Sequence, residues 1–333
     1  MNHDRVPNPR VFVSRQLPRQ TEARMGELFQ AVLRLDDAPL SAEAMLDGMK
    51  AADVFVPTVT DDVDAALIAA MPDSVRLIAN FGVGVDHIDL AAAKKRGILV
   101  TNTPGVLTED TADMAMALMM STVRRMRAGG RLLRSGQWTG WAPTSLRGHR
   151  IGGKALGIVG MGRIGGAVAA RANAFGMKVH YHNRSRMPEA AETALNATWW
   201  DDLDAMLPEV DVLTIHCPLT PETHGLIDAR RLSLMKPEAY VINTARGEIV
   251  DEAALAAALR DGKLAGAGLD VFSDEPNVPD EILALDNVTL LPHMGSATIE
   301  GRRAMGDKVI TNIRVWSDGH RPPDQVLEGW LPG

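Results

Sequence analysis

The sequence predicts an α/β protein with two doubly wound parallel sheets. Three observations support this prediction. Strand and helix signals alternate from residue 10 to residue 101, a glycine motif at residues 160–165 joins an apolar run to a helical pattern, and the alternation resumes after residue 210. Strands that alternate with helices are typical of parallel sheets with helices on both faces. The chain has 333 residues, of which 46% are apolar, so it is long enough for two domains of ordinary size.

Five strands are expected in the first part of the chain, as short apolar runs at residues 11–14, 32–35, 54–56, 77–80 and 98–101. Helical patterns lie between them, at residues 21–29, 42–51, 62–71 and 90–96. Ser41 is the candidate N-cap of the second helix, because its hydroxyl can accept a hydrogen bond from a free N–H of the first turn. The pattern at residues 108–124 predicts a helix that is apolar around most of its circumference, so we expect it to be buried between layers or subunits.

The second part of the chain repeats the alternation. Strands are expected at residues 155–159, 178–182, 211–216, 239–243, 265–270 and 288–291, and helices at 164–176, 252–261 and 296–316. Residues 127–148 contain glycines, prolines, Trp138 and Trp141, and we expect a loop there. Tryptophans on a loop favour burial at an interface, so this loop predicts a dimer contact. The alternative is that both side chains fold back on their own domain.

The stretch from Lys154 to Arg186 predicts a dinucleotide site. Gly160, Gly162 and Gly165 have the G-x-G-x-x-G spacing between a strand and a helix. Glycine allows a tight turn at the first position, close approach of a pyrophosphate at the second and close packing of helix and strand at the third. The N-terminus of the helix then holds the phosphates. The alternative is a glycine-rich turn that binds nothing.

The end of the next strand predicts which cofactor binds. A site specific for NAD usually has Asp or Glu about 20 residues after the glycines, but the segment His182 to Arg186, HNRSR, has no acid. A guanidinium can bind a 2′-phosphate that a carboxylate would repel. We therefore expect a preference for NADP(H) over NAD(H), through Arg184 and Ser185, with Asn183 and Arg186 in support. The alternative is an ordinary solvated basic loop.

Composition argues against several function classes. The net charge of −7 gives no electrostatic support for a nucleic-acid partner. No window approaches about 20 uninterrupted apolar residues, and the N-terminal MNHDRVPNPR lacks the apolar core of a secretion signal. Cys217 is the only cysteine, so no disulfide can form within the chain and a cytoplasmic location is expected. The spacing of Asp86, His87 and Asp89 matches no standard metal site, and helix-cap roles are favoured instead.

Polar residues follow the predicted strands of the second part. They are Cys217-Pro218, Thr244-Ala245-Arg246, Asp270 and Pro292-His293. Ligands of open α/β sheets bind at that edge. In the first part, Phe81-Gly82-Val83-Gly84 follows a strand, where consecutive N–H groups can bind an anion such as the carboxylate of a small acid. A plain tight turn capped by Asp86 is the alternative.

Arg246, Glu275 and His293 have the chemistry needed to reduce a 2-oxo acid beside a nicotinamide, which supplies the hydride. His293 is the natural proton donor near neutral pH. Glu275 can hydrogen-bond the other ring nitrogen and favour the imidazolium, and Arg246 can bind the carboxylate and the keto oxygen. Each residue also has a structural alternative: a strand-edge cap for His293, a turn with Pro276 for Glu275, and a surface ion pair for Arg246.

These segments resemble those of the D-2-hydroxyacid dehydrogenase family, and most of all its glyoxylate/hydroxypyruvate reductase branch. The similarity runs from VFVSRQLP near the N-terminus to the helix after HMGSAT, and it includes GMGRIG, NTARGEIVD, GLDVFSDEP and LPHMGSAT in that order. The resemblance implies that Arg246 orients the substrate, that Glu275 tunes the histidine and that His293 is the acid/base. NFGVGVDHID resembles the loop whose N–H groups, here at Val83 and Gly84, hold the substrate carboxylate.

The resemblance also implies a fold, cofactor contacts and a partner. It implies a flavodoxin-like substrate domain at residues 1–107 plus 297–333 and a Rossmann NAD(P)-binding domain at residues 108–296, with a cleft between them. Asp270 resembles the residue that positions the nicotinamide amide, and Trp141 resembles a residue that reaches the pocket of the partner subunit in a homodimer. Together with the motifs above, the expected cofactor contacts are Thr111, Gly160, Gly162, Arg163, Ile164, Gly165, Asn183, Arg184, Ser185, Arg186, Cys217, Pro218, Thr223, Thr244, Ala245, Asp270 and Gly295.

The sequence therefore predicts an NADPH-dependent reductase that converts glyoxylate and hydroxypyruvate to D-2-hydroxy acids, with no metal. One alternative is a related dehydrogenase for a bulkier 2-oxo acid or for 3-phosphoglycerate; the latter is disfavoured because the chain ends at Gly333 without a regulatory domain. Formate oxidation is disfavoured by Glu275, since the formate enzymes that this chain resembles have no Glu-His pair there. Another alternative is a non-catalytic, dinucleotide-sensing scaffold similar to a transcriptional corepressor.

Overall fold

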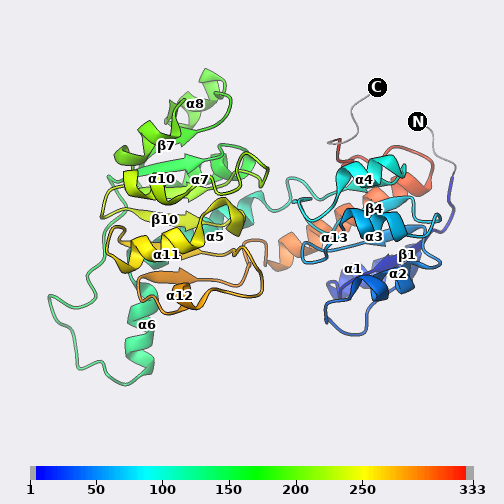
Figure 1. The fold of residues 1–333 in the computed structure, drawn as a ribbon, viewed down its shortest axis with the longest axis horizontal. Helices are drawn as coiled ribbons and strands as arrows, with labels where there is room; N and C mark the ends of the chain where they lie inside the picture. The colour runs from blue at the N-terminus through cyan, green and yellow to red at the C-terminus, as the bar shows by residue number, and fades with distance from the viewer. Residues whose placement is uncertain (1–4, 328–333) are drawn as a thin grey trace. The chain divides into compact units, whose positions relative to one another are not determined.

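A computed structural model describes residues 5–327, which divide into two compact units (Figure 1). Unit 1 comprises Met1–Leu107 and Ala297–Gly333, of which residues 1–4 and 328–333 lie outside the described part. Unit 2 comprises Thr108–Ser296. Each unit is built around one parallel sheet, which confirms the predicted fold class.

Unit 1 contains a five-stranded sheet in the order β2-β1-β3-β4-β5. Its strands are β1 (Arg10–Val13), β2 (Gln30–Val32), β3 (Val54–Val56), β4 (Leu77–Ala79) and β5 (Leu99–Thr101). Its helices are α1 (Arg19–Leu28), α2 (Ala42–Met49), α3 (Ala65–Ala70), α4 (Leu90–Lys95) and α13 (Ile299–Ser317). Strands β3, β4 and β5 are buried along their whole length, which explains why their sequences are continuously apolar.

Alternate residues of these strands pack into two separate cores. Val54 and Val56 of β3 share a core with Met305 of α13, whereas Phe55 shares the other core with Ile68 of α3. Because successive side chains of a strand point to opposite faces, α1 and α13 cover one face of the sheet and α2, α3 and α4 cover the other. Helix α13 is thus part of unit 1, although it follows unit 2 in the sequence.

Unit 2 contains a seven-stranded sheet in the order β12-β11-β10-β9-β6-β7-β8. Its strands are β6 (Ala155–Val159), β7 (Lys178–His182), β8 (Ala197–Trp200), β9 (Val212–Ile215), β10 (Tyr240–Asn243), β11 (Gly266–Leu269) and β12 (Val288–Leu290). Its helices are α5 (Thr108–Val123), α6 (Met126–Arg134), α7 (Arg163–Ala174), α8 (Glu189–Leu195), α9 (Leu203–Met206), α10 (Ala229–Leu234), α11 (Glu252–Arg260) and α12 (Asp280–Leu283). The strand order reverses between β6 and β9, and a ligand site is expected where such a reversal occurs.

Some elements differ from the sequence prediction. The helix expected at residues 62–71 begins only at Ala65, because the carboxylate of Asp64 caps it by accepting the Leu67 N–H at 2.7 Å. Strand β2 lies at Gln30–Val32 rather than at residues 32–35. The segment at residues 127–148, expected to be a loop, contains most of α6, none of whose residues is buried. Within residues 5–327, no helix is long and apolar enough to cross a membrane.

Candidate active site

The glycine motif forms a tight turn between β6 and α7. Gly160 has a φ of 95°, which favours glycine, and a Cβ there would lie 2.4 Å from the backbone nitrogen of Cys217. A Cβ on Gly165 would lie 2.2 Å from the carbonyl oxygen of Gly160, whereas one on Gly162 would meet open space. The turn is therefore packed closely at its first and third glycines and open at the second. The first turn of α7 has N–H groups without helical partners, and these suit a phosphate.

The segment after β7 is held against the glycine turn. The Asn183 side-chain oxygen accepts a hydrogen bond from the Met161 N–H at 2.7 Å. Arg184, Ser185 and Arg186 are exposed. The chain therefore presents two cations and a hydroxyl beside the turn, and it presents no carboxylate within this segment.

Arg186 is anchored to a carboxylate of α8. Its Nε and Nη2 donate to the two oxygens of Glu192 at 2.9 and 2.8 Å, and its guanidinium lies 5.4 Å from the centre of a Trp199 ring. The Tyr181 hydroxyl donates to Glu192 at 2.5 Å and accepts the Met187 N–H at 3.0 Å. The hydrogen bonds from Arg186, and then from Tyr181, lower the pKa of Glu192 from 4.5 to about 2. The loop at residues 183–187 is thus fixed at both ends.

Glu275 and His293, which follow β11 and β12, meet at the carboxyl edge of the sheet in unit 2. His293 Nδ1 lies 2.7 Å from Glu275 Oε2, and the Phe272 N–H donates to Oε1 at 3.0 Å. Burial opposes ionisation of Glu275, but the hydrogen bond and charge of His293, the Phe272 N–H and the charge of Arg246 outweigh it. The pKa of Glu275 is therefore lowered from its usual value. A carboxylate at Nδ1 fixes the tautomer with a proton on Nδ1 and leaves Nε2 for proton transfer.

His293 stands on a turn that Asp270 holds in place. Its backbone has a φ of 49°, in the sparsely populated left-handed region. Asp270 is buried and its carboxylate accepts the Met294 N–H at 2.8 Å and the Gly295 N–H at 2.7 Å. Burial raises the pKa of Asp270 despite these bonds. Strained backbone of this kind persists only where neighbouring contacts hold it.

Arg246 is the N-cap of a short 3₁₀ helix, Gly247–Ile249, that follows β10. Its carbonyl oxygen accepts a hydrogen bond from Asn243 Nδ2 at 2.7 Å, and its charge lowers the pKa of Glu275. A Cβ on Gly247 would lie 2.0 Å from the carbonyl carbon of Phe272, so the Arg246 loop packs directly on the loop that leads to Glu275. The structure thus brings the three predicted reactive groups to one edge of unit 2.

The remaining predicted cofactor positions lie in the first turns of helices and in the segments that follow strands of unit 2. They are Thr111 in α5, Arg163 and Ile164 in α7, Cys217, Pro218 and Thr223 after β9, and Thr244 and Ala245 after β10. Burial raises the pKa of Cys217 to about 11, so this thiol stays neutral. The Thr244 hydroxyl is buried and has no hydrogen-bond partner among the described residues. A buried hydroxyl without a partner suits a polar ligand group.

In unit 1, Val83 and Gly84 lie in the loop that follows β4. Both are partly exposed, and neither N–H donates a hydrogen bond within residues 5–327. Asp89 accepts the Ala92 N–H at 2.8 Å as the N-cap of α4, which confirms its expected helix-cap role. His87 does not cap a helix, and its Nε2 lies 3.2 Å from the side-chain oxygen of Asn80.

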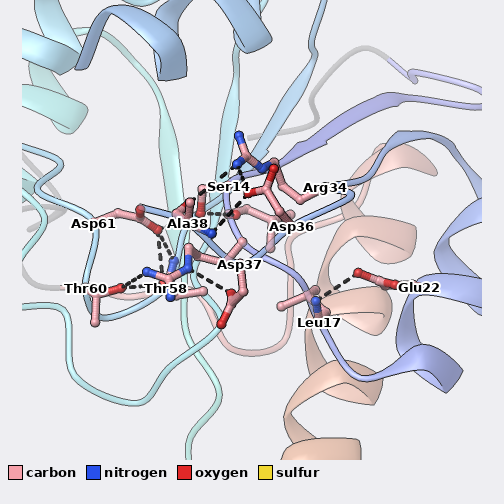
Figure 2. Close-up of polar contacts among 12 residues, drawn as sticks. Ser14, Leu17, Glu22, Arg34, Asp36, Asp37, Ala38, Thr58, Thr60 and Asp61 are labelled. Atoms are coloured by element: carbon pink, nitrogen blue, oxygen red, sulfur yellow. Dashed lines mark hydrogen bonds and ion pairs between the residues drawn. The ribbon is translucent and has the colours of Figure 1, made fainter. Parts of the chain in front are cut away.

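A polar network lies next to that loop. Figure 2 shows Ser14 and Thr58 turned toward Asp61, whose Oδ2 lies 2.6 Å from Ser14 Oγ and 2.7 Å from the Thr58 N–H. The segment that contains Asp61 approaches the glycine loop closely, because a Cβ on Gly82 would lie 2.6 Å from Val59 Cγ1. The predicted anion-binding loop therefore packs against a segment that is held by the hydrogen bonds of Asp61. Sequence reasoning did not find this network, because Ser14 follows β1 whereas Thr58 and Asp61 follow β3.

Trp138 and Trp141 do not fold back on their own unit. They are 55% and 84% exposed, and α6 before them exposes Met126 and Leu133. Arg131 of α6 pairs with Asp286 at 2.7 Å. Figure 1 shows α6 and the loop that follows it extending from the rest of unit 2. Within the described chain nothing covers these apolar side chains.

Comparisons with known proteins agree with the predicted family. Residues 116–295 match the family model of the D-isomer specific 2-hydroxyacid dehydrogenase NAD binding domain. The chain is 44% identical to a glyoxylate reductase of Thermococcus litoralis over 96% of each chain. It is similar to the structure of an NADPH-dependent glyoxylate/hydroxypyruvate reductase from Sinorhizobium meliloti in complex with NADP and malonate (37% identity, TM-score 0.85, 97% of this chain and 98% of that chain). It is also similar to a glyoxylate reductase from Paecilomyes thermophila (33% identity, TM-score 0.86, 97% and 99%). The chain therefore belongs to the D-isomer-specific 2-hydroxyacid dehydrogenase family.

Proposed function

We propose that this protein is an NADPH-dependent reductase of small 2-oxo acids, glyoxylate and hydroxypyruvate first, and that it forms D-2-hydroxy acids. The observation that carries the proposal is the His293–Glu275 pair, with 2.7 Å between Nδ1 and Oε2, at the edge of the sheet where Arg246 also lies. The similarity to proteins named glyoxylate reductase supports the choice of acid. The similarity to an NADPH-dependent reductase with bound NADP supports the choice of cofactor.

In this proposal His293 protonates the oxygen of the substrate. A bound reduced nicotinamide supplies the hydride that reduces the carbonyl carbon. Glu275 accepts the hydrogen bond from Nδ1 and stabilises the imidazolium, so the proton on Nε2 can pass to the carbonyl oxygen as negative charge develops there. Arg246 orients the substrate and offsets the same developing charge with its guanidinium.

We assign binding of the substrate carboxylate to unit 1 and dinucleotide binding to unit 2. In unit 1, the N–H groups of Val83 and Gly84 are proposed to hold the carboxylate, because they are available in a partly exposed loop. In unit 2, the open space at Gly162 and the buried hydroxyl of Thr244 fit a dinucleotide. Asp270 is proposed to orient the nicotinamide amide in addition to holding its own turn. A reductase that draws on cellular NADPH is expected in the cytoplasm.

The proposed preference for NADP(H) rests on the loop at residues 183–187. Arg186 already binds both oxygens of Glu192, whereas Arg184 donates no hydrogen bond to any residue in the described range. We therefore assign the 2′-phosphate to Arg184 and Ser185, and we assign the anchoring of the loop to Arg186. Asn183 supports the site by tying the loop to the glycine turn.

The working form is proposed to be a homodimer in which the α6 arm, residues 126–148, meets a second copy. The exposed apolar side chains of this arm support that proposal, because large apolar side chains that lie together on a surface mark interaction sites. The partner subunit's Trp141 is then proposed to reach the substrate pocket.

A substrate panel tests the proposed function. NADPH oxidation is measured with glyoxylate, hydroxypyruvate, pyruvate and phenylpyruvate, and each rate is repeated with NADH. We expect the highest kcat/KM with glyoxylate and hydroxypyruvate, and higher values with NADPH than with NADH. A preference for phenylpyruvate would indicate a dehydrogenase of bulkier acids. No oxidation with any acid would favour a dinucleotide-sensing scaffold.

A further inference from the structure

We propose that Asn80 and Asn102 are positioning residues that aim the Val83 and Gly84 N–H groups at the substrate carboxylate. The inference rests on the proposed function, because it takes a 2-oxo acid as the ligand of that loop. Asn80 directly follows β4 and Asn102 directly follows β5, and these strands are paired, with Ala79 opposite Thr101. Neighbouring strands therefore bring both side chains to the loop at residues 82–84.

The two side-chain amides hold three successive carbonyl oxygens. Asn80 Nδ2 lies 3.2 Å from the oxygen of Gly82 and 2.8 Å from the oxygen of Gly84. Asn102 Nδ2 lies 2.8 Å from the oxygen of Val83. An amide nitrogen carries two donor hydrogens, so Asn80 uses both on this loop.

Holding a carbonyl also sets the direction of the next N–H. In a trans peptide the C=O of one residue and the N–H of the next lie in one plane and point in opposite directions. The hydrogen bond from Asn80 to the Gly82 oxygen therefore directs the Val83 N–H away from Asn80. In the same way, the hydrogen bond from Asn102 to the Val83 oxygen directs the Gly84 N–H away from Asn102. No residue from 82 to 85 has a positive φ, so the direction of these donors depends on the hydrogen bonds to the loop's carbonyl oxygens rather than on a left-handed residue. The two amides supply these bonds, together with the backbone N–H of Thr103, which donates to the Gly82 oxygen at 3.0 Å and which a side-chain substitution at Thr103 leaves in place.

His87 fixes the orientation of the Asn80 amide. Asn80 is fully buried, and its side-chain oxygen lies 3.2 Å from His87 Nε2. Because Nδ2 is occupied with the two carbonyls, the oxygen is the acceptor and the His87 Nε2 carries the proton. A flip of the amide would break three hydrogen bonds, so a single arrangement is favoured.

The chemistry of the amide group suits this position. A carboxylate has the same shape but is only an acceptor, so an aspartate at position 80 or 102 would face the carbonyl oxygens that it must hold. It would also place negative charge near a bound anion. An amide supplies donors without charge, and the loop's own N–H groups remain for the ligand.

The test compares Asn80→Asp and Asn102→Ala with Thr103→Val as the matched control. Thr103 is the buried neighbour of Asn102, and its hydroxyl has no hydrogen-bond partner within residues 5–327. The measurements are the KM for glyoxylate, the Ki for oxamate as an unreactive carboxylate analogue, kcat, the KM for NADPH and Tm. In each asparagine variant we expect KM and Ki to rise together by about tenfold, because hydrogen bonds to a charged ligand are weakened.

A change in KM and Ki without a change in kcat or Tm distinguishes a positioning role from a structural one. A lost contact to the carboxylate raises KM with little change in kcat, and the KM for NADPH stays unchanged because the cofactor residues belong to unit 2. Thr103→Val should alter none of these values. Wild-type KM and Ki in both asparagine variants would overturn the inference, and so would a fall in kcat and Tm without a rise in Ki. If Asn80→Asp does not fold, Asn102→Ala decides alone.

The proposed function and this inference fail in different ways. A wild-type protein that does not reduce glyoxylate would contradict the proposed function itself. If the wild type reduces glyoxylate, and Arg246→Ala weakens glyoxylate binding while the two asparagine variants do not, only the positioning role is contradicted.

Discussion

His293 shows how single residues set up the proposed chemistry. Its backbone adopts a left-handed conformation, with a φ of 49°, that costs free energy in a residue other than glycine. Asp270 holds that turn through two backbone N–H groups, and Glu275 holds the ring at 2.7 Å. Because the pKa of Glu275 lies below its usual value, its carboxylate stays ionised at neutral pH and can accept the hydrogen bond from Nδ1.

Arg184 should decide the choice between cofactors. In Arg184→Ala we expect the preference for NADPH over NADH, expressed as the ratio of kcat/KM values, to fall by about tenfold to a hundredfold, because a charge-assisted contact to the 2′-phosphate is lost. The KM for NADH should change little. Steady-state kinetics with both cofactors measure this ratio.

Arg186→Ala provides the contrast for that experiment. This change breaks the pair with Glu192 and should lower Tm as well as weaken NADPH binding, whereas Arg184→Ala should leave Tm unchanged. An unchanged cofactor ratio in Arg184→Ala would contradict the assignment of the phosphate to this residue.

At the scale of elements, the connection from β7 to α8 should be stabilised by an ionised Glu192. Its pKa is lowered from 4.5 to about 2 in the folded protein by Arg186 first and then Tyr181. A group whose pKa is lowered by folding stabilises the fold fully above its unfolded pKa, and the contribution is lost as the pH falls through the folded pKa. The stabilisation is therefore complete above about pH 4.5 and decreases toward pH 2.

Urea unfolding of the wild type and of Glu192→Gln measures this effect. We expect the difference in the free energy of unfolding to be largest at neutral pH and to shrink as the pH falls below about 4.5. Glu189→Gln, in the exposed first turn of the same helix, is the control and should show no such difference. A difference for Glu192→Gln that does not vary with pH would rule out the ionised pair as its source.

The sequence predicts helices and strands well where an apolar run is continuous or where a capping residue marks the start of a helix. Ser41, the expected N-cap of α2, does accept the Ala44 N–H, and the five residues of β6 were predicted without error. Helix α6 was not predicted, because Gly129 and Gly130 lie in its middle and glycine disfavours a helix interior, and none of its residues is buried. Strand β8 was missed because it lies at the sheet edge and is only partly buried.

At the scale of the whole molecule, the sequence predicts the reactive side chains better than the residues that hold them in position. Arg246, Glu275 and His293 carry distinctive chemistry and follow recognisable strands. Asn80 and Asn102 do not stand out, because their role appears only when two paired strands place them under one loop. Short polar motifs can therefore be recognised from sequence, whereas the contacts that orient them depend on tertiary structure.

The exposed apolar side chains of the α6 arm lead us to expect a dimer. Leu133 is 61% exposed on this arm, and a charge there should disfavour an apolar contact between two copies. We expect sedimentation analysis to show a dimer for the wild type and a monomer for Leu133→Asp. Leu35→Asp, at a leucine that is 97% exposed in unit 1, is the control and should remain dimeric. A monomeric wild type at micromolar concentration would contradict the proposed dimer.

The most direct test of the central claim is glyoxylate-dependent oxidation of NADPH by His293→Ala, measured beside a fluorescence titration of NADPH binding. The proposed proton transfer predicts a fall in kcat of about 10²- to 10⁴-fold, with the Kd for NADPH unchanged. Turnover at the wild-type rate in this variant would contradict the assignment of His293 as the proton donor.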